Sequence, residues 1–219
     1  MTEAPLNRHD HFVKLFPKEP AFRLKQIEKA YFTESMKGWE DVTTLGKEMR
    51  EVLIKEIPWM SYTPVTTLSS KAGDTHKVVL SGNDEQYFES VLMRNNRDQW
   101  TICVSSQIGC AMGCTFCATG TMGLKRSLSS DEIADQYRFW KQFLSQRPEL
   151  PQRISNVVFM GMGEPLVNVD NVKKAIHTWL DYTDLGPTKV TVSTVGVLPV
   201  LEGILTDPDW PPVRIAISL

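Results

Sequence analysis

The residues best suited to chemistry are four cysteines in one short stretch. They are Cys103, Cys110, Cys114 and Cys117, and the chain has no others. A secreted disulfide scaffold would spread its cysteines to join distant loops, whereas clustered cysteines point to metal or redox chemistry. The last three, separated by three and then two residues, could hold three corners of a 4Fe–4S cluster and leave one iron open to an exogenous ligand. The spacing therefore predicts Cys110, Cys114 and Cys117 as cluster ligands.

A structural zinc site is the alternative interpretation of the same residues. Cys103 and the three loop cysteines together could supply the four thiolates that zinc accepts. Such zinc sites normally use two separated pairs of ligands, however, and Cys103 falls in a predicted strand. The spacing favours the iron–sulfur cluster, and the identity of the metal separates the two interpretations.

Glycine-rich and hydroxyl-bearing segments follow the next predicted strands. In Gly161-Met-Gly-Glu-Pro165, the glycines let the backbone approach a ligand, and carbonyl groups and Glu164 could accept hydrogen bonds from an ammonium group. Ser193 and Ser218 come at the ends of the two strands after that. A glycine turn and helix-capping hydroxyls would explain each segment alone. Their repetition after successive strands predicts one ligand-binding rim.

The elements that must position these residues form an α/β pattern. The predicted strands are residues 100–104, 154–160, 189–193 and 213–219. The predicted helices are residues 129–143, 170–179 and a segment from about 199. Near-continuous apolar strands alternating with helices are typical of a parallel sheet covered by helices. Ser129 and Glu132 form a capping box at the start of the first of these helices.

Two smaller sections precede this core. The domains we predict are residues 1–60, 61–99 and 100–219. The first is a small helical module, because apolar residues recur at helical spacing after Pro20 and over residues 45–57. The second is a short antiparallel section with strands at 77–80 and 86–93. From residue types alone, the first section is an ordinary solvated helical module.

Bulk composition excludes few functions. A net charge of −2, with 42% hydrophobic and 23% charged residues, is typical of a globular protein and does not indicate nucleic-acid binding. The polar N-terminus lacks the apolar core of a signal peptide, and no apolar run approaches the roughly 20 residues that span a bilayer. We therefore expect a cytoplasmic protein with no membrane contact. Because the chain stops on an apolar strand at Leu219, we also expect a C-terminally truncated sequence.

Together these motifs resemble the RlmN/Cfr family of radical S-adenosylmethionine RNA adenine methyltransferases. The resemblance lies in the cysteine triad and in residues 103–110, 161–166, 190–196 and 217–219. It begins at about Pro20, where residues 20–27 are similar to the family's N-terminal RNA-handling module. It implies a partial (β/α) TIM-like barrel of the radical S-adenosylmethionine type, incomplete at the C-terminus. The helical domain and the short antiparallel β section would precede this barrel.

The resemblance also implies an activity, cofactors and partners. The family methylates carbon 2 of an adenine in large-subunit ribosomal RNA, and in one branch transfer RNA, through a methylated cysteine near the C-terminus. The cofactors would be a 4Fe–4S cluster and S-adenosylmethionine, with a small redox protein as electron donor and a monomeric enzyme. The residues that match family positions holding S-adenosylmethionine are Gly163, Glu164, Ser193, Ser218 and Leu219.

Two further residues gain a role only through the resemblance. Glu89 matches the family's proposed proton acceptor, although by itself it is an ordinary strand glutamate. Cys103 matches the thiol that releases the product by forming a transient disulfide, although by itself it is a small buried residue. Because no cysteine follows Cys117, the methyl-carrying residue is absent, and we expect this chain not to complete methyl transfer. Another radical S-adenosylmethionine enzyme and a zinc-binding RNA-interaction module are the alternative functions.

Overall fold

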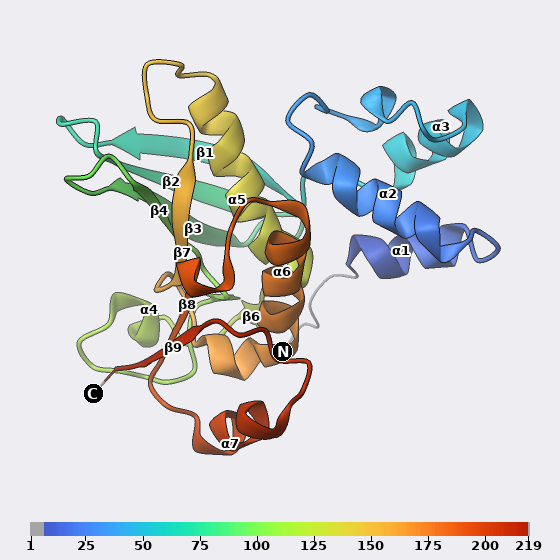
Figure 1. The fold of residues 1–219 in the computed structure, drawn as a ribbon. Coiled ribbons are helices and arrows are strands. Elements are labelled where there is room, and N and C mark those ends of the chain that lie inside the picture. Colours follow the sequence, from blue (N-terminus) through green and yellow to red (C-terminus); the bar gives the residue numbers. More distant parts are fainter. Residues whose placement is uncertain (1–6, 219) are drawn as a thin grey trace.

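The computed structural model describes residues 7–218 as a sheet backed by helices (Figure 1). The sheet has seven strands in the order β1-β2-β3-β4-β7-β8-β9. Their bounds are β1 (Tyr62–Ser69), β2 (Thr75–Gly82), β3 (Tyr87–Arg94), β4 (Trp100–Cys103), β7 (Ile154–Phe159), β8 (Val190–Thr194) and β9 (Arg214–Ile217). Strands β1 to β4 pair antiparallel, whereas β4, β7, β8 and β9 pair parallel. The predicted α/β architecture is confirmed.

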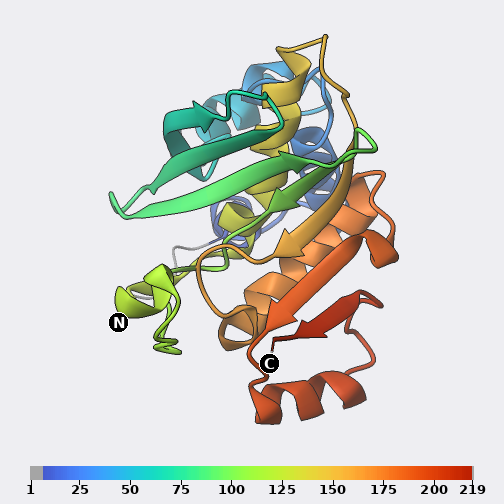
Figure 2. The same ribbon diagram turned by 90° about the vertical axis from the view of Figure 1, so that its left-hand side faces the viewer.

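Strand register divides the sheet into a covered face and an open face. Side chains alternate between faces along a strand, and residues paired across strands share a face. The covered face is apolar and fully buried, as at Ile102 and Val157. Cys103, Val158 and Thr191 are partners in register across β4, β7 and β8, so they lie together on the other face. In Figure 2 this open face is turned toward the viewer and the long helices lie behind the sheet.

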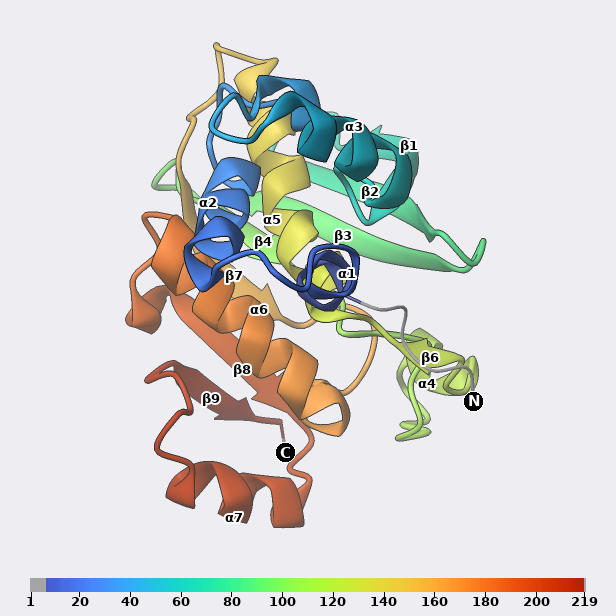
Figure 3. The ribbon, with the colours of Figure 1, turned by 90° about the vertical axis from the view of Figure 1, so that its right-hand side faces the viewer.

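Two long helices cover the apolar face (Figure 3). They are α5 (Ser130–Ser145) and α6 (Val169–Tyr182), and the tryptophans Trp140 and Trp179 are fully buried beneath them. The predicted capping box forms at the start of α5, because the Ser129 hydroxyl accepts the backbone N–H of Glu132 while the Glu132 carboxylate accepts that of Ser129. This part also contains α7 (Leu198–Thr206) and two 3-10 turns, η2 (Pro165–Asn168) and η3 (Pro187–Lys189).

Three helices and a 3-10 turn precede the sheet. Their bounds are α1 (Arg8–Leu15), α2 (Ala21–Tyr31), η1 (Trp39–Asp41) and α3 (Lys47–Glu56). They have their own apolar cluster, in which Tyr31, Trp39 and Trp59 pack ring against ring, and they lie outside α5 and α6, away from the sheet (Figure 3). The domain boundaries near residues 60 and 99 stay predictions. No helix within residues 7–218 is long and apolar enough to cross a membrane.

A buried ionic network fastens the N-terminal helices to α5. Asp135 is fully buried and accepts hydrogen bonds from the guanidinium groups of Arg8 and Arg138. Asp135 also accepts hydrogen bonds from the backbone N–H and the hydroxyl of Ser61, both at 2.8 Å. Burial alone would raise the pKa of Asp135, but the two guanidinium groups lower it to about 2. The carboxylate therefore stays charged and joins three segments of the chain.

Strand β1 and helix α1 are among the elements not expected from the sequence, because neither has a buried face that would impose a period. In β1 only Tyr62 is buried, and every following residue is exposed, so no alternation of apolar residues arises. Helix α1 buries only Arg8 and Phe12. Both elements are held by neighbours in space, which sequence patterns do not reveal.

We expect the substitution Asp135→Asn to lower the free energy of unfolding by about 3–5 kcal/mol at pH 7, because Arg138 loses its buried carboxylate partner and Arg8 is left with Asp131 at 3.3 Å. Since the folded-state pKa is about 2, the stabilisation by Asp135 should be present above roughly pH 4 and disappear as the pH falls toward 2. Urea unfolding at several pH values measures both effects.

The matched control is Asp181→Asn, on the exposed surface of α6, which should stay within about 0.5 kcal/mol of the parent. An Asp135→Asn protein as stable as the control would show that the network contributes no stability.

Candidate functional site

The predicted cluster ligands lie in a loop that follows β4 and closes on itself. Strands β5 (Gln107–Ile108) and β6 (Arg126–Ser127) pair antiparallel at its neck, and the backbone N–H of Cys110 donates to the Gly123 carbonyl at 3.2 Å. Gly109 has a φ of +74°, and a Cβ there would collide with the same Gly123 carbonyl. Only glycine fits this crossing. Figure 2 shows the loop, in yellow-green, projecting beyond the end of the sheet.

The three cysteines share this loop without forming a finished ligand set. Cys110 is buried, Cys114 and Cys117 are half-buried, and none is in a disulfide. Cys117 directly precedes the short helix α4 (Ala118–Thr121), and its backbone N–H donates to the Cys114 carbonyl at 3.1 Å. Across the described part of the chain, no three His, Cys, Asp or Glu side chains come together as a metal-binding group. The ring of Phe116, beside Cys117, is 91% exposed.

The segment that leads from β4 into the loop is buried backbone held by side chains. The Gln136 amide of α5 accepts the N–H of Ser105 and donates to its carbonyl, both at 2.9 Å. Asn168 of η2 donates to the carbonyls of Ser106 and Leu128, both at 2.8 Å. Buried peptide groups outside a strand ladder need such partners. These two amides therefore fix the base of the cysteine loop.

The loop after β7, residues 161–164, is hydrogen bonded to the same segment. The Met162 carbonyl accepts the N–H groups of Ser106 and Gln107 at 2.8 and 3.1 Å, and the Gln107 side chain accepts the N–H of Glu164 at 2.9 Å. Gly163 has a φ of +100°, and a Cβ there would lie 2.5 Å from the Gln107 Cβ. The loops after β4 and β7 thus form one unit, and their close approach requires glycine.

Glu164 links β7 to β8 in the structure. Its side chain is buried, and Oε1 accepts the Thr194 hydroxyl at 2.6 Å and the Leu166 N–H at 3.0 Å. Oε2 accepts the Val195 N–H at 3.0 Å. Protein donors therefore occupy most of the carboxylate's acceptor capacity. The structure gives Glu164 a supporting part, and direct contact with a cofactor stays a prediction.

Glu89 and Cys103 lie near one another on the open face. Cys103 pairs in register with Val91, which lies two residues after Glu89 on β3, so the two side chains project from the same face. The Ser105 hydroxyl donates to the Glu89 carbonyl at 2.6 Å, which ties Glu89 to the start of the cysteine loop. The Glu89 carboxylate is half exposed and pairs with Lys77 at 3.1 Å.

The thiol of Cys103 is protonated at neutral pH. Burial raises its pKa to about 11, although a hydrogen bond with the backbone of Met160 acts in the opposite direction. A protonated thiol is a poor nucleophile, so Cys103 must lose this proton before it can attack another sulfur.

The other predicted cofactor residues lie toward the far edge of the sheet. Ser193 is half-buried and, two residues after Thr191, faces the open side of β8. Ser218 is exposed, and its N–H donates to the Thr194 carbonyl at 2.9 Å. Leu219 lies outside the described residues. Thus Ser193 lies at the end of β8 and Ser218 directly follows β9, at the ends of neighbouring strands as predicted, and their contact with a cofactor stays a prediction.

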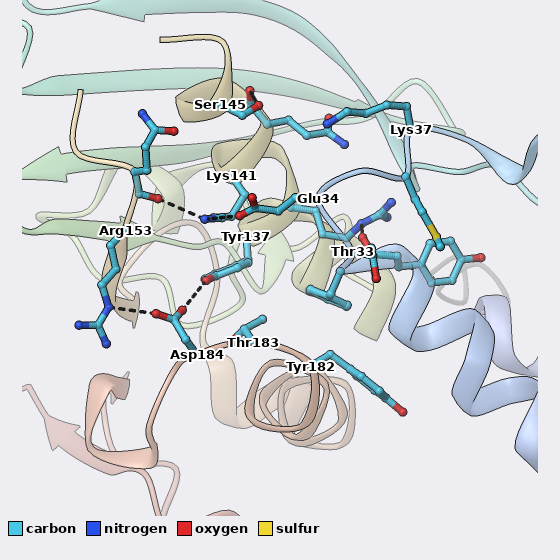
Figure 4. A pocket seen from close by; sticks show the side chains of 16 residues that line it. Thr33, Glu34, Lys37, Tyr137, Lys141, Ser145, Arg153, Tyr182, Thr183 and Asp184 are labelled. Atoms are coloured by element: carbon cyan, nitrogen blue, oxygen red, sulfur yellow. Dashed lines mark hydrogen bonds and ion pairs between the residues drawn. The ribbon is translucent and has the colours of Figure 1, made fainter. Parts of the chain in front are cut away.

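A cavity of about 510 Å³ lies on the helix side of the sheet, away from these residues (Figure 4). It separates the segment after α2 from the C-terminal ends of α5 and α6. Lys141 pairs there with Glu34 at 2.8 Å, and Arg153 pairs with Asp184 at 3.0 Å. Four of its charged groups are thus paired with one another, and none of the predicted site residues lines it. We assign it no part in the chemistry.

The sequence analysis missed the side chains that hold the loops. They are Gln136, Asn168, Thr194 and Arg126, all buried. A polar residue on the buried face of a helix usually has a specific partner, so Gln136, one turn after Glu132, carried a usable signal. No spacing or composition marks the other three.

The loop of clustered cysteines at the carboxyl ends of parallel strands defines the class of protein. Residues 104–218 match the sequence profile of the Radical SAM superfamily, and the chain belongs to this superfamily. A crystal structure of a radical SAM methyltransferase from Sphaerobacter thermophilus is similar with a TM-score of 0.83 and 31% identity, covering 100% of this chain and 64% of that one.

Curated relatives narrow the resemblance further. A protein of Aquifex aeolicus named "Probable dual-specificity RNA methyltransferase RlmN" is 40% identical over 201 residues, which are 90% of this chain and 55% of the relative. A Rhodococcus jostii protein of the same name is 42% identical over 206 residues, covering 91% and 55%. The predicted resemblance to RlmN proteins is confirmed, and the chain spans about half the length of these relatives.

The cofactors of this superfamily, a 4Fe–4S cluster and S-adenosylmethionine, fit the residues present. Cys110, Cys114 and Cys117 are free thiols in one glycine-closed loop at the carboxyl end of a parallel strand, which is the soft donor set that iron–sulfur clusters require. The loop containing Gly163 lies beside the base of the cysteine loop. The three thiols and the neighbouring glycine loop are therefore compatible with this pair of cofactors.

We expect Gly163→Ala to lower the free energy of unfolding by about 2–3 kcal/mol, because its φ is unfavourable for alanine and its Cβ would collide with Gln107. The matched control is Gly203→Ala, where nothing lies within 4 Å of the added Cβ and a helical alanine should be neutral or stabilising. Urea unfolding compares the two. Equal stability would mean that the loops after β4 and β7 are not tightly joined.

We expect Cys103 to react with iodoacetamide more slowly than Cys114 and Cys117 in the metal-free protein, because its thiol is buried and its pKa is about 11. Its rate should rise with pH up to about that value. Peptide mass spectrometry after timed alkylation measures each cysteine separately. A Cys103 that reacts fastest at pH 7 would contradict the buried, protonated thiol.

Proposed function

We propose that this protein is a radical S-adenosylmethionine enzyme that methylates carbon 2 of an adenine in large-subunit ribosomal RNA, with transfer RNA as a second substrate. The observation that carries the proposal is the placement of Glu89 and Cys103 on one sheet face, at the end where the cysteine loop begins. The RNA substrate is supported by the names of the relatives. Bases that stand outside a helical stack are the accessible targets for such chemistry.

In this proposal, Cys110, Cys114 and Cys117 hold the cluster. The loop that contains Gly163, and Ser193, Ser218 and Leu219 at the ends of the next two strands, contact S-adenosylmethionine. When bound, these cofactors supply the one-electron chemistry that unreactive carbon atoms require. The residues of the chain position the cofactors and restrict access of water. Glu164 supports this rim by joining β7 to β8.

Glu89 and Cys103 act on the RNA side of the same face. The Glu89 carboxylate is half exposed and not enclosed by protein, so it can reach a bound base and accept its proton. Cys103 is the thiol that, once deprotonated, would attack the sulfur of the methylene-bearing cysteine. The S–S bond forms as the bond from that sulfur to the methylene carbon breaks, and the carbon keeps the electron pair and stays on the adenine.

The methyl-carrying cysteine that the proposal requires is not among the four cysteines of this sequence. We therefore propose that the chain alone does not complete methyl transfer. A small redox protein as electron donor, a monomeric state and a cytoplasmic location belong to the same proposal.

Anaerobic reconstitution with iron and sulfide tests the proposal. We expect about four iron atoms and four sulfides per chain, and an electron paramagnetic resonance signal of the reduced cluster that changes when S-adenosylmethionine is added. The change reports an iron that is open to the cofactor. Cys114→Ser should lose both the iron and the signal, whereas Cys103→Ser should keep them.

Zinc in place of iron, or a cluster whose signal ignores S-adenosylmethionine, would contradict the proposed chemistry. The substrate class is tested by binding of an RNA hairpin with an unpaired adenine. Equal affinity for the same sequence as DNA would count against RNA as the substrate.

A further inference from the structure

Arg126 is a buried charged residue at the neck of the cysteine loop, and no step proposed above uses it. In the β5–β6 ladder it pairs with Ile108, and Ile108 is two residues before Cys110 in the sequence. Its side chain is 2% exposed. Burying a guanidinium group costs several kcal/mol unless its donors find acceptors, so its contacts indicate what holds it there.

The guanidinium group joins two carboxylates from distant parts of the chain. Its Nε and Nη2 donate to Asp84, in the turn between β2 and β3, with Nη2 at 3.0 Å. Its Nη1 and Nη2 donate to Glu132, in the first turn of α5, at 2.8 and 2.9 Å. Burial alone would lower the pKa of Arg126, but the two carboxylates raise it above its usual value. We call these three residues the Arg126 clamp.

The surroundings of the clamp are tightly packed. A Cβ on Gly82 would lie 2.7 Å from Nη2, so the guanidinium group packs directly on the backbone at the end of β2. The Glu132 side chain is 1% exposed and also accepts the N–H of Ser129. Here the guanidinium group pairs with both oxygens of each carboxylate and is buried. Such pairs differ from surface ion pairs, which contribute little to stability.

The clamp connects the three parts that the proposed reaction must hold together. Asp84 belongs to the hairpin whose second strand carries Glu89, and Glu132 lies one turn before Gln136, which fixes Ser105. We propose that Arg126 is a positioning residue for the iron–sulfur site. It fixes the neck of the cysteine loop relative to Glu89 and α5, so that the loop holds its three thiols in place for the cluster. This inference rests on the proposed function.

Two variants open the clamp without leaving an unpaired buried charge. Asp84→Asn weakens one side and keeps the Arg126–Glu132 pair. The double variant Arg126→Met with Glu132→Gln removes both buried charges and keeps a glutamine able to complete the capping box. Arg153→Met is the matched control, because it removes an exposed ion pair far from the loop. Circular dichroism and thermal unfolding establish that each variant is folded.

The first measurement is loss of iron from the reconstituted protein to a chelator. Substitution of residues that support metal ligands commonly weakens metal sites by about 10- to 100-fold. We expect about tenfold faster loss from the clamp variants, together with a smaller spectroscopic response to S-adenosylmethionine. The control should behave as the parent. The second measurement is alkylation of Cys114 and Cys117 in the metal-free protein, which should be faster in both clamp variants.

The two measurements separate the two proposals. If the parent chain takes up no iron, the proposed function fails, while alkylation still reports whether Arg126 holds the loop. Folded clamp variants whose cysteines react at the parent rate overturn the positioning role, as do variants that retain iron and respond to S-adenosylmethionine like the parent.

Discussion

The backbone that leaves the sheet after β4 is buried, and buried peptide groups must be hydrogen bonded. Residues 105–107 cannot continue the ladder, because the chain turns there into the cysteine loop. Their three N–H groups and the carbonyls of Ser105 and Ser106 are hydrogen bonded to Gln136, Asn168 and the Met162 carbonyl. Each partner comes from a different element, so this requirement draws α5, η2 and the loop after β7 to one place. The position of the cysteine loop follows from that convergence.

The convergence of these segments also explains why two positions require glycine. Gly109 and Gly163 both adopt positive φ, and each sits where another chain segment passes too closely for a Cβ. These glycines allow close packing, and the resulting loops are held by their contacts. Glu164 extends the same arrangement to β8, since its carboxylate accepts Thr194 and Val195. The rim is therefore continuous over three neighbouring parallel strands before any ligand is considered.

The sequence was informative where burial imposes a period or where chemistry imposes a spacing. The parallel strands were predictable because they are apolar, α5 because Ser129 and Glu132 form a capping box at its start, and the cysteine triad because its spacing suits a cluster. Strand β1 was not, since its side chains are exposed on both faces. Gln136, Asn168 and Arg126 were not assigned a role either. Ser105 lies 31 positions from Gln136, Ser106 and Leu128 lie 62 and 40 positions from Asn168, and Asp84 lies 42 positions from Arg126. Such pairings depend on the tertiary fold and have no local signal.

Helix α5 meets a different neighbour on each side within two turns. Glu132 takes part in the Arg126 clamp, Asp135 binds Arg8, and Gln136 holds Ser105. A helix is stiff over this length, so α5 holds the N-terminal helices and the cysteine loop in fixed positions relative to each other. A motion that separates the N-terminal helices or the cysteine loop from the sheet must disturb the same two turns of α5. The N-terminal helices, α5 and the cysteine loop should therefore open together as one cooperative unit in hydrogen exchange. As a result, neighbouring positions on this one helix are each constrained by a different contact. Few substitutions in these two turns can preserve all of the contacts at once.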